Sequence, residues 1–383
     1  MKVLGHQPAL DGLRGVAVIL IMALHAGVPF STGGFVGLEL FFALSGFLVT
    51  KLLLQQRDRD GRFRVGRFLS RRVYRLLPAF AVLLVAVTVA PTVFVVTTGR
   101  REILQPLLLQ YSNLAQAAGD AGDFGLLQHT WSLALEEQFY VAWALVLLVC
   151  SAASDRVIAA VGAALSATSF LLLAMTYVEG PAPSAYYRLD TRAGTLLLGA
   201  VAAVAVHRGW VRPGRPLLVG GYVAALGLVV SVPLVSMGAH QAAVFRFGFL
   251  LAGLAATAVV ITIVLHPDAL LARGLRARIL TWAGVVSYAL YLWHPPLYHW
   301  SAELLPGEHW LPPVAVGTAA SVAAAIVSLH LVERPALRLR DRRDRSQAHV
   351  EAGPEPLGVC HPTTASTATV PATAVASSIG ARS

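Results

Sequence analysis

Long apolar runs, each of about 20 residues, make up most of this 383-residue chain and are separated by short polar segments. A helix of that length crosses the hydrocarbon core of a bilayer. With 56% hydrophobic and 13% charged residues, the chain is also too apolar for a soluble protein of this size. We therefore predict an all-α, polytopic integral membrane protein with about ten transmembrane helices. The predicted spans are 12–30, 35–54, 76–97, 131–151, 157–177, 192–207, 216–236, 244–265, 280–302 and 313–332, with a shorter apolar piece at 103–114 that would be re-entrant or interfacial.

Basic residues concentrate in every second loop. Arg-rich segments follow the second, sixth, eighth and tenth spans, whereas 31–34 and 237–243 contain no Lys or Arg. Because cytoplasmic loops accumulate these residues, the alternation predicts that both termini are cytoplasmic, with Arg100 and Arg101 as the main exception. The same rule accounts for the formal charge of +10 without a nucleic-acid partner.

The composition changes near the C-terminus. The residues after about 346 are rich in Ser, Thr, Ala and Pro and poor in large apolar side chains. We predict a membrane-embedded domain over 1–340 and a disordered cytoplasmic tail over 341–383. The two cysteines, Cys150 and Cys360, have no spacing typical of a metal site or a disulfide framework, so no metal is expected.

The first predicted span carries an arginine and a histidine on one face. Arg14 and His25 are eleven residues apart, which is almost three helical turns and about 16 Å. Arg14 would lie near the cytoplasmic end, and His25 about five residues from the outer end. Arg14 could simply snorkel to the interface, and His25 could form an interhelical hydrogen bond. Ionisable groups within a span are nevertheless candidates for a functional site.

A glutamate in the fourth predicted span matches His25 in depth. This span begins "HTWSLALEEQFY" and runs inward, which places Glu136 about five residues from the outer surface. A carboxylate beside an imidazole would fix the tautomer of the ring and stabilise its protonated form. Glu137 points about 100° away from Glu136 on the helix and is the candidate for an interfacial position.

Further polar residues fall in the same outer half of the predicted spans. They are Glu39, Asp190, Arg192 and His294. Asp190 and Arg192 could simply pair with each other, and His294, beside two prolines, could satisfy the carbonyl groups that the prolines free. Their concentration at one level predicts a polar cavity that is open to the outside.

The cytoplasmic side offers a different chemistry. The stretch "FLSRRVYRLLPAF" places Arg72 and Arg75 on one helix face, at positions i and i+3. Ordinary loop charge explains most basic residues here, but the planar guanidinium group also suits a phosphate site.

The chain resembles the bacterial membrane acyltransferase-3 family over about residues 8 to 340. The family's pattern of Arg, ten residues and His falls on Arg14 and His25, and its Trp-Ser-Leu-x-x-Glu carboxylate falls on Glu136. Its Arg-x-x-Arg pattern, linked to CoA binding, falls on Arg72 and Arg75. Many members carry Asp where this chain has Glu39, which keeps the charge. The motifs, in order, are "LDGLRGVAVILIMALH", "GGFVGLELFFALSGFL", "RRVYRLLPAF", "HTWSLALEEQFY", "YRLDTRAGTLLLGA" and "SYALYLWHPPL".

The resemblance implies an enzyme of the bacterial cytoplasmic (inner) membrane that transfers an acyl group, often acetyl, from acyl-CoA to a hydroxyl. No permanently bound cofactor is implied; acyl-CoA, the acceptor and the lipid bilayer are the expected partners. The acceptor would be a cell-surface or envelope glycan, or alternatively a macrolide-like or glycosylated metabolite. Some members continue into an extracytoplasmic esterase-like domain, and we expect this chain to act without one.

The expected mechanism assigns one role to each end of the membrane domain. His25 would take the proton of the attacking hydroxyl, or carry the acyl group itself, while Glu136 holds the ring. Arg72, Arg75 and Arg14 would bind the phosphates of CoA, and Arg14 could instead form a structural ion pair. A transporter or flippase for a polar solute would share the helices and buried polar groups, and release of free CoA thiol on addition of the acceptor separates the enzyme from it. A scaffold without catalysis is disfavoured because the proposed base and carboxylate are both present.

Overall fold

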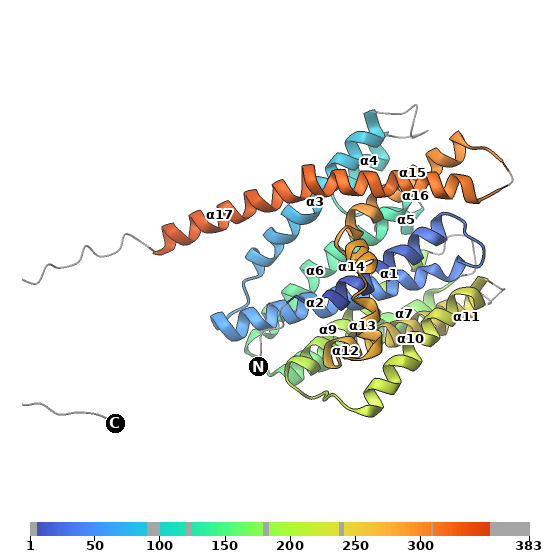
Figure 1. Cartoon of the computed structure of the whole chain (residues 1–383). Coiled ribbons are helices and arrows are strands. Elements are labelled where there is room, and N and C mark those ends of the chain that lie inside the picture. The colour runs from blue at the N-terminus through green and yellow to red at the C-terminus, as the bar shows by residue number, and fades with distance from the viewer. Residues whose placement is uncertain are drawn as a thin grey trace, which may run out of the picture. The chain divides into compact units, whose positions relative to one another are not determined.

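A computed structural model describes residues 6–89, 100–119, 124–178, 184–236, 241–307 and 309–352, and this part of the chain contains helices and no strands (Figure 1). The longer helices are α1 (Pro8–His25), α2 (Val36–Asp60), α3 (Val65–Val89), α6 (Trp131–Val149), α7 (Asp155–Thr176), α9 (Gly194–His207), α10 (Arg215–Ser236), α12 (Phe249–Leu265), α15 (Ser287–Leu304), α16 (Leu311–Ser328) and α17 (Arg334–Ala352). The shorter helices are α4 (Arg100–Leu108), α5 (Ser112–Ala118), α8 (Leu189–Arg192), α11 (Gln241–Ala243), α13 (Leu270–Leu275) and α14 (Arg278–Val285). Single turns at Thr32–Phe35 (η1), Gly125–Thr130 (η2), Cys150–Ala152 (η3) and Ser184–Tyr186 (η4) are 3₁₀-helical, and those at Val244–Gly248 (η5) and Leu329–Glu333 (η6) are π-helical.

Eight of the ten predicted spans fall on helices that are long and apolar enough to cross a membrane. The other two are the sixth, which falls on α9 with only 14 residues, and the ninth, which is interrupted at Val286 and falls on α14 and α15. Helix α15 has 18 residues and two internal prolines. The prediction of an all-α polytopic membrane protein is confirmed. The predicted piece 103–114 forms α4 and the start of α5, with a turn between them.

Two predicted boundaries are wrong in ways that matter for the site. Helix α3 begins at Val65, eleven residues before the predicted span, because the Arg-rich segment is itself helical. Its charged residues leave no apolar run there from which a span could be predicted. Part of the predicted span, 90–97, lies outside the described residues. The first span ends at His25 and does not extend to 30. The fourth span's α-helix, α6, begins at Trp131 as predicted, but the 3₁₀ turn η2 precedes it, so the apolar helical segment starts at Gly125.

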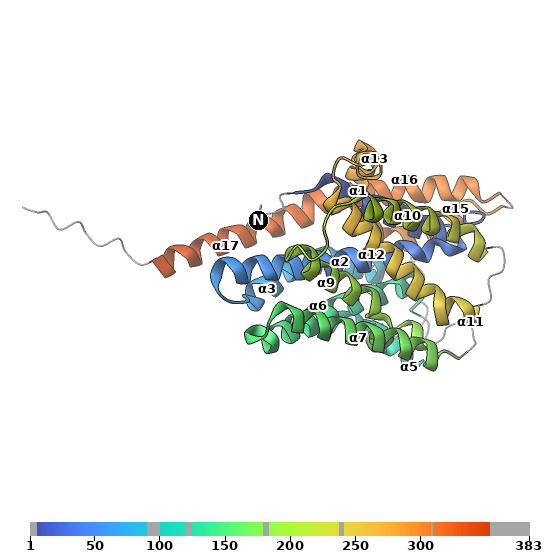
Figure 2. The same ribbon diagram turned by 90° about the horizontal axis from the view of Figure 1, so that it is seen from below.

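Small residues allow the central helices to approach closely. A Cβ atom added at Gly46 of α2 would lie 1.8 Å from the carbonyl oxygen of Leu196 on α9, and one at Gly199 of α9 would lie 2.2 Å from that of Ala43 on α2. Such contacts are typical of helices packed in membranes. Figures 1 and 2 show α2 lying beside α9, so α2 forms the middle of the helix packing that positions the site.

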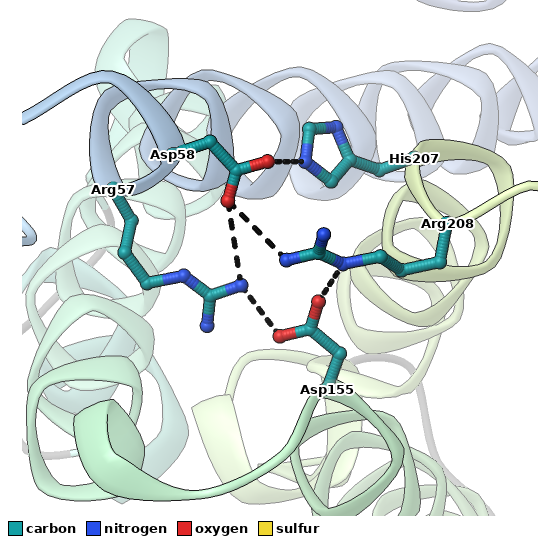
Figure 3. Close-up of polar contacts among 5 residues, drawn as sticks. All are labelled: Arg57, Asp58, Asp155, His207 and Arg208. Carbon is teal, nitrogen blue, oxygen red and sulfur yellow. Dashed lines mark hydrogen bonds and ion pairs between the residues drawn. The ribbon is translucent and has the colours of Figure 1, made fainter. Parts of the chain in front are cut away.

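A network of charged side chains ties α2, α7 and α9 together at one end (Figure 3). Asp58 accepts hydrogen bonds from His207, 2.8 Å away, and from Arg208, 3.2 Å away. Asp155 accepts from Arg57 over 2.6 Å and also from Arg208. From the sequence, Arg57 and Arg208 were assigned only to the basic cytoplasmic loops. The neighbouring residues did not indicate which carboxylates would be their partners.

The chain divides into two compact units, Met1–Arg340 and Asp341–Ser383. Everything described below belongs to the first. In the second, residues 341–352 are helical although we predicted them as part of a disordered tail. This stretch contains no Gly or Pro and is rich in good helix formers, which favours a helix; the Ser, Thr, Ala and Pro that suggested a disordered tail lie mainly after it. Residues 353–383 of the predicted tail lie outside the described residues.

Candidate active site

Three arginines and two glutamates line one cavity between α1, α2, α3, α6 and α15. Arg14 comes from α1, Arg72 and Arg75 come from α3, and Glu136 and Glu137 come from α6. The structure therefore brings together all three arginines that the sequence suggested for phosphate binding. Glu137, the candidate for an interfacial position, lines the same cavity as Glu136. Two residues 100° apart on a helix can both line a cavity that is wide enough, and here both do.

Glu136 is held by two hydroxyl groups. Ser45 Oγ donates to one carboxylate oxygen over 3.0 Å, and the Tyr140 hydroxyl donates to the other over 3.0 Å. The guanidinium carbon of Arg72 lies 4.6 Å from the centre of the Tyr140 ring, which places its positive charge over an aromatic face. Ser45 and Tyr140 were not among the residues predicted from the sequence. Tyr140 follows Glu136 by four residues, one turn of helix, and that spacing was the available signal.

Arg14 forms no ion pair among the described residues. Its guanidinium donates to the hydroxyl of Ser287, with Nη2 at 3.1 Å, and lies near the ring of Phe41. The structural ion pair considered for Arg14 is thus absent from the described part of the chain. Like many arginines in a span, it remains available to an anion in the cavity.

A second cavity shares the three arginines with the first. It is also lined by Gln7, near the N-terminal end of α1, and by Lys51 and Gln55 of α2, so it extends toward that end of the helices. Arg14, Arg72 and Arg75 line both cavities, as does Leu48. A long ligand with phosphates at one end could therefore place the phosphates at the arginines and extend from one cavity into the other.

His25 does not meet Glu136, so the predicted pairing is wrong. His25 is exposed at the C-terminal end of α1, and its Nδ1 lies 3.0 Å from Nε2 of His294. The two span boundaries explain the error. Because α1 ends five residues before 30 and η2 adds six residues ahead of 131, the two residues lie about eleven positions further apart than predicted, or roughly 16 Å along the helix axes.

A layer of packed rings lies between the cavity and the histidine pair. Tyr291 lines the cavity, its hydroxyl donates to the carbonyl oxygen of His129 over 2.8 Å, and its ring centre lies 5.7 Å from that of His294. The Ser132 hydroxyl, 2.6 Å from that of Tyr291, also lines the cavity. His129 is 5% exposed, and within the described residues neither of its ring nitrogens has a hydrogen-bond partner. His129 is the first residue of the motif "HTWSLALEEQFY" but was not among the site residues predicted from the sequence.

The pairing of Asp190 with Arg192, which the sequence left open as an alternative, is replaced by two other ion pairs. Arg192 Nη2 lies 2.6 Å from Glu39 Oε1, and Thr195 donates to the other oxygen over 2.5 Å. Asp190 is exposed and pairs with Arg188, and this hydrogen bond raises the pKa of Arg188. One turn of helix, α8, points Asp190 outward and Arg192 into the protein.

The Glu39–Arg192 pair is a structural element that joins α2 to the start of α9. Glu39 is 0% and Arg192 3% exposed, and the guanidinium carbon lies 4.0 Å from the ring centre of Phe249. Tyr186 stacks nearby, with its ring centre 5.1 Å from the guanidinium carbon, and burial raises the pKa of Tyr186 to about 12. The hydroxyl therefore stays neutral, and the charges of Glu39 and Arg192 compensate each other in this buried location.

Residues 7–332 match the family described as "Acyltransferase domain". The chain is 31% identical over 355 residues to the peptidoglycan O-acetyltransferase OatA of Listeria monocytogenes, an alignment that covers 86% of this chain and 56% of that protein. A putative peptidoglycan O-acetyltransferase of Bacillus subtilis, YrhL, is 30% identical over 349 residues, covering 86% and 55%. A putative O-acetyltransferase of Staphylococcus aureus is 32% identical over 308 residues, covering 76% and 51%.

The chain thus spans about half the length of the curated relatives it matches. No solved structure matches it.

Proposed function

Because the chain belongs to the acyltransferase family whose domain it matches across residues 7–332, we propose that it is a membrane O-acyltransferase. It transfers an acetyl group from acetyl-CoA to a hydroxyl of a cell-envelope glycan of the peptidoglycan type. The acceptor is inferred from the names of the relatives, and the donor from the residues of the cavity. The identity of the donor is supported by one observation: Arg14, Arg72 and Arg75 line two cavities at once.

Arginine suits the proposed donor because CoA carries phosphates at one end of a long, narrow arm. The planar guanidinium group binds phosphate through paired hydrogen bonds. Arg72 and Arg75 hold the phosphates, and Arg14, one helix away, binds the arm or a phosphate. We assign Glu136 to this cavity. Held by Ser45 and Tyr140, it offsets part of the positive charge and orients the arginines before the donor enters.

His25 is the proposed general base. As the hydroxyl oxygen attacks the thioester carbonyl carbon, a C–O bond forms and His25 accepts the hydroxyl proton. The C–S bond then breaks, and the leaving thiolate takes the proton back from His25, which yields the ester and free CoA thiol. In an alternative form of this mechanism, His25 first carries the acetyl group, on the same ring nitrogen that would otherwise accept the proton.

The two ends of the helices correspond to the two sides of the membrane in this proposal. Both termini lie in the cytoplasm of a bacterium, where acetyl-CoA is made, and the arginine-lined cavities open to that side. The exposed His25 lies on the outer side, where the glycan is. The thioester end of the donor must then pass the layer of Tyr291 and Ser132 to reach His25.

The test supplies radiolabelled acetyl-CoA to liposomes that contain the purified protein, with peptidoglycan fragments or a glycosylated macrolide as acceptor. We expect labelled glycan and an equal amount of free CoA thiol, and at least a 10²-fold slower transfer by His25→Ala. The variant His299→Ala, an exposed histidine on α15, is the control. Movement of acceptor across the bilayer without thiol release would show a transporter instead, and full activity of His25→Ala would refute the base.

A further inference from the structure

The hydrogen bond between His25 and His294 fixes which nitrogen of each ring carries a proton. His294 Nδ1 lies 3.0 Å from the carbonyl oxygen of Leu290, and a carbonyl oxygen can only accept, so Nδ1 donates. A neutral imidazole has a single N–H, and His294 Nε2 therefore holds a lone pair. The atom 3.0 Å from it, His25 Nδ1, must be the donor of that hydrogen bond.

The reactive nitrogen of His25 follows from this chain of donors and acceptors. With its proton on Nδ1, the neutral ring leaves Nε2 as the only basic nitrogen. We propose that His294 is a positioning residue that holds His25 in the tautomer and orientation in which Nε2 takes the proton of the acceptor hydroxyl. The inference rests on the proposed function for the identity of that hydroxyl, but the tautomer itself does not depend on it.

The side chain of His294 is held in one orientation by its surroundings. Its side chain is 0% exposed, and the rings of His129, Tyr291 and Tyr298 surround it, with ring centres at 5.8, 5.7 and 6.0 Å. A ring packed on three sides and bonded at both nitrogens cannot turn without losing both hydrogen bonds. His25, in contrast, ends its helix and is exposed, so it needs a fixed partner to hold its orientation.

A neutral imidazole here takes the place that a carboxylate usually has beside a catalytic histidine. Within the described residues, no carboxylate lies within hydrogen-bond distance of His25 or His294. Neutral His294 accepts the Nδ1–H bond of His25 as a carboxylate would, but it places no charge in the protein interior, where an uncompensated charge is costly. When His25 gains its second proton, the same bond becomes charge-assisted and stronger, so the partner stabilises the transition state more than the ground state.

The experiment combines spectroscopy with kinetics on the full-length protein in liposomes. Nitrogen-15 NMR of protein labelled at histidine distinguishes protonated from lone-pair ring nitrogens, and the His25→Ala spectrum assigns the signals of His25. In the wild type we expect Nδ1 of His25 protonated and Nε2 bare, and in His294→Phe we expect that preference to be lost.

The kinetic arm uses two variants and one control. His294→Phe keeps the ring but not the acceptor, so kcat should fall about 10²-fold while KM for acetyl-CoA is unchanged. His294→Gln offers an amide oxygen near the position of Nε2 and should recover most of the loss, whereas His299→Phe on the same helix should have no effect.

Three results would overturn the proposal: a proton on Nε2 of His25 in the wild type, full kcat in His294→Phe, or a Gln variant as slow as the Phe variant. Failure of the proposed function is a different result. In that case the wild type transfers no acetyl group, while the NMR pattern still decides whether His294 sets the tautomer.

Discussion

Removing one partner of the buried Glu39–Arg192 pair should cost the protein a large part of its stability. In Glu39→Gln, Arg192 keeps its charge in a location that is 3% exposed and has lost its counter-ion. Breaking a buried pair in this way costs about 3–5 kcal/mol of unfolding free energy, because the remaining charge is desolvated and uncompensated. Arg192→Met should cost a similar amount for the converse reason.

The double variant distinguishes this explanation from a simple loss of packing. Glu39→Gln combined with Arg192→Met leaves no unpaired charge, so its loss should be clearly smaller than the sum of the two single losses. The control is Asp190→Asn, which removes the partner of exposed Arg188 and should change stability by less than about 1 kcal/mol. Urea unfolding of the protein in detergent, followed by tryptophan fluorescence, measures all four variants.

Two results would refute the reasoning about this pair. One is a Glu39→Gln protein within about 1 kcal/mol of the wild type, which would mean that the charges are not buried together. The other has two parts: the stability losses of Glu39→Gln and Arg192→Met add up in the double variant, and the losses of Arg192→Met and Asp190→Asn do not add up when these two are combined. That outcome would restore the pairing expected from their closeness in the sequence.

Three further predictions address the donor cavity, the unpartnered histidine and the helix packing. Arg72→Ala and Arg75→Ala should each raise KM for acetyl-CoA about tenfold, as expected for the loss of a charged hydrogen bond of about 1.5 kcal/mol or more; exposed Arg156, replaced by Ala, is the control, and an equal effect there would argue against a specific phosphate site. His129→Phe should be neutral or slightly stabilising in thermal unfolding, because it replaces by carbon two ring nitrogens that have no hydrogen-bond partner within the described residues, and a loss of several kcal/mol would mean that these nitrogens have partners. Gly46→Ala should destabilise the protein by about 1–3 kcal/mol in urea unfolding, since the added Cβ would lie 1.8 Å from a carbonyl oxygen of α9, and wild-type stability would show that α2 and α9 can separate without cost.

The helices and the residues that carry polar chemistry were largely predictable from the sequence. Bilayer thickness sets the length of an apolar run, so hydrophobicity alone located eight helices that are long and apolar enough to cross a membrane. Arg14, Arg72 and Arg75 were predicted to share a site, and they line one cavity. Such properties depend on local composition and on helical spacing, which a single sequence contains.

The partners of these residues were decided by the tertiary structure. His25 meets His294 and not Glu136, and Arg192 meets Glu39 and not Asp190. The physical reason is that a hydrogen bond needs atoms within about 3 Å. A change of five residues in where a helix begins moves a side chain by about 7 Å along the axis. The sequence by itself determined that charged and titratable groups lie among the membrane helices, and only the packing of those helices decided which of them touch.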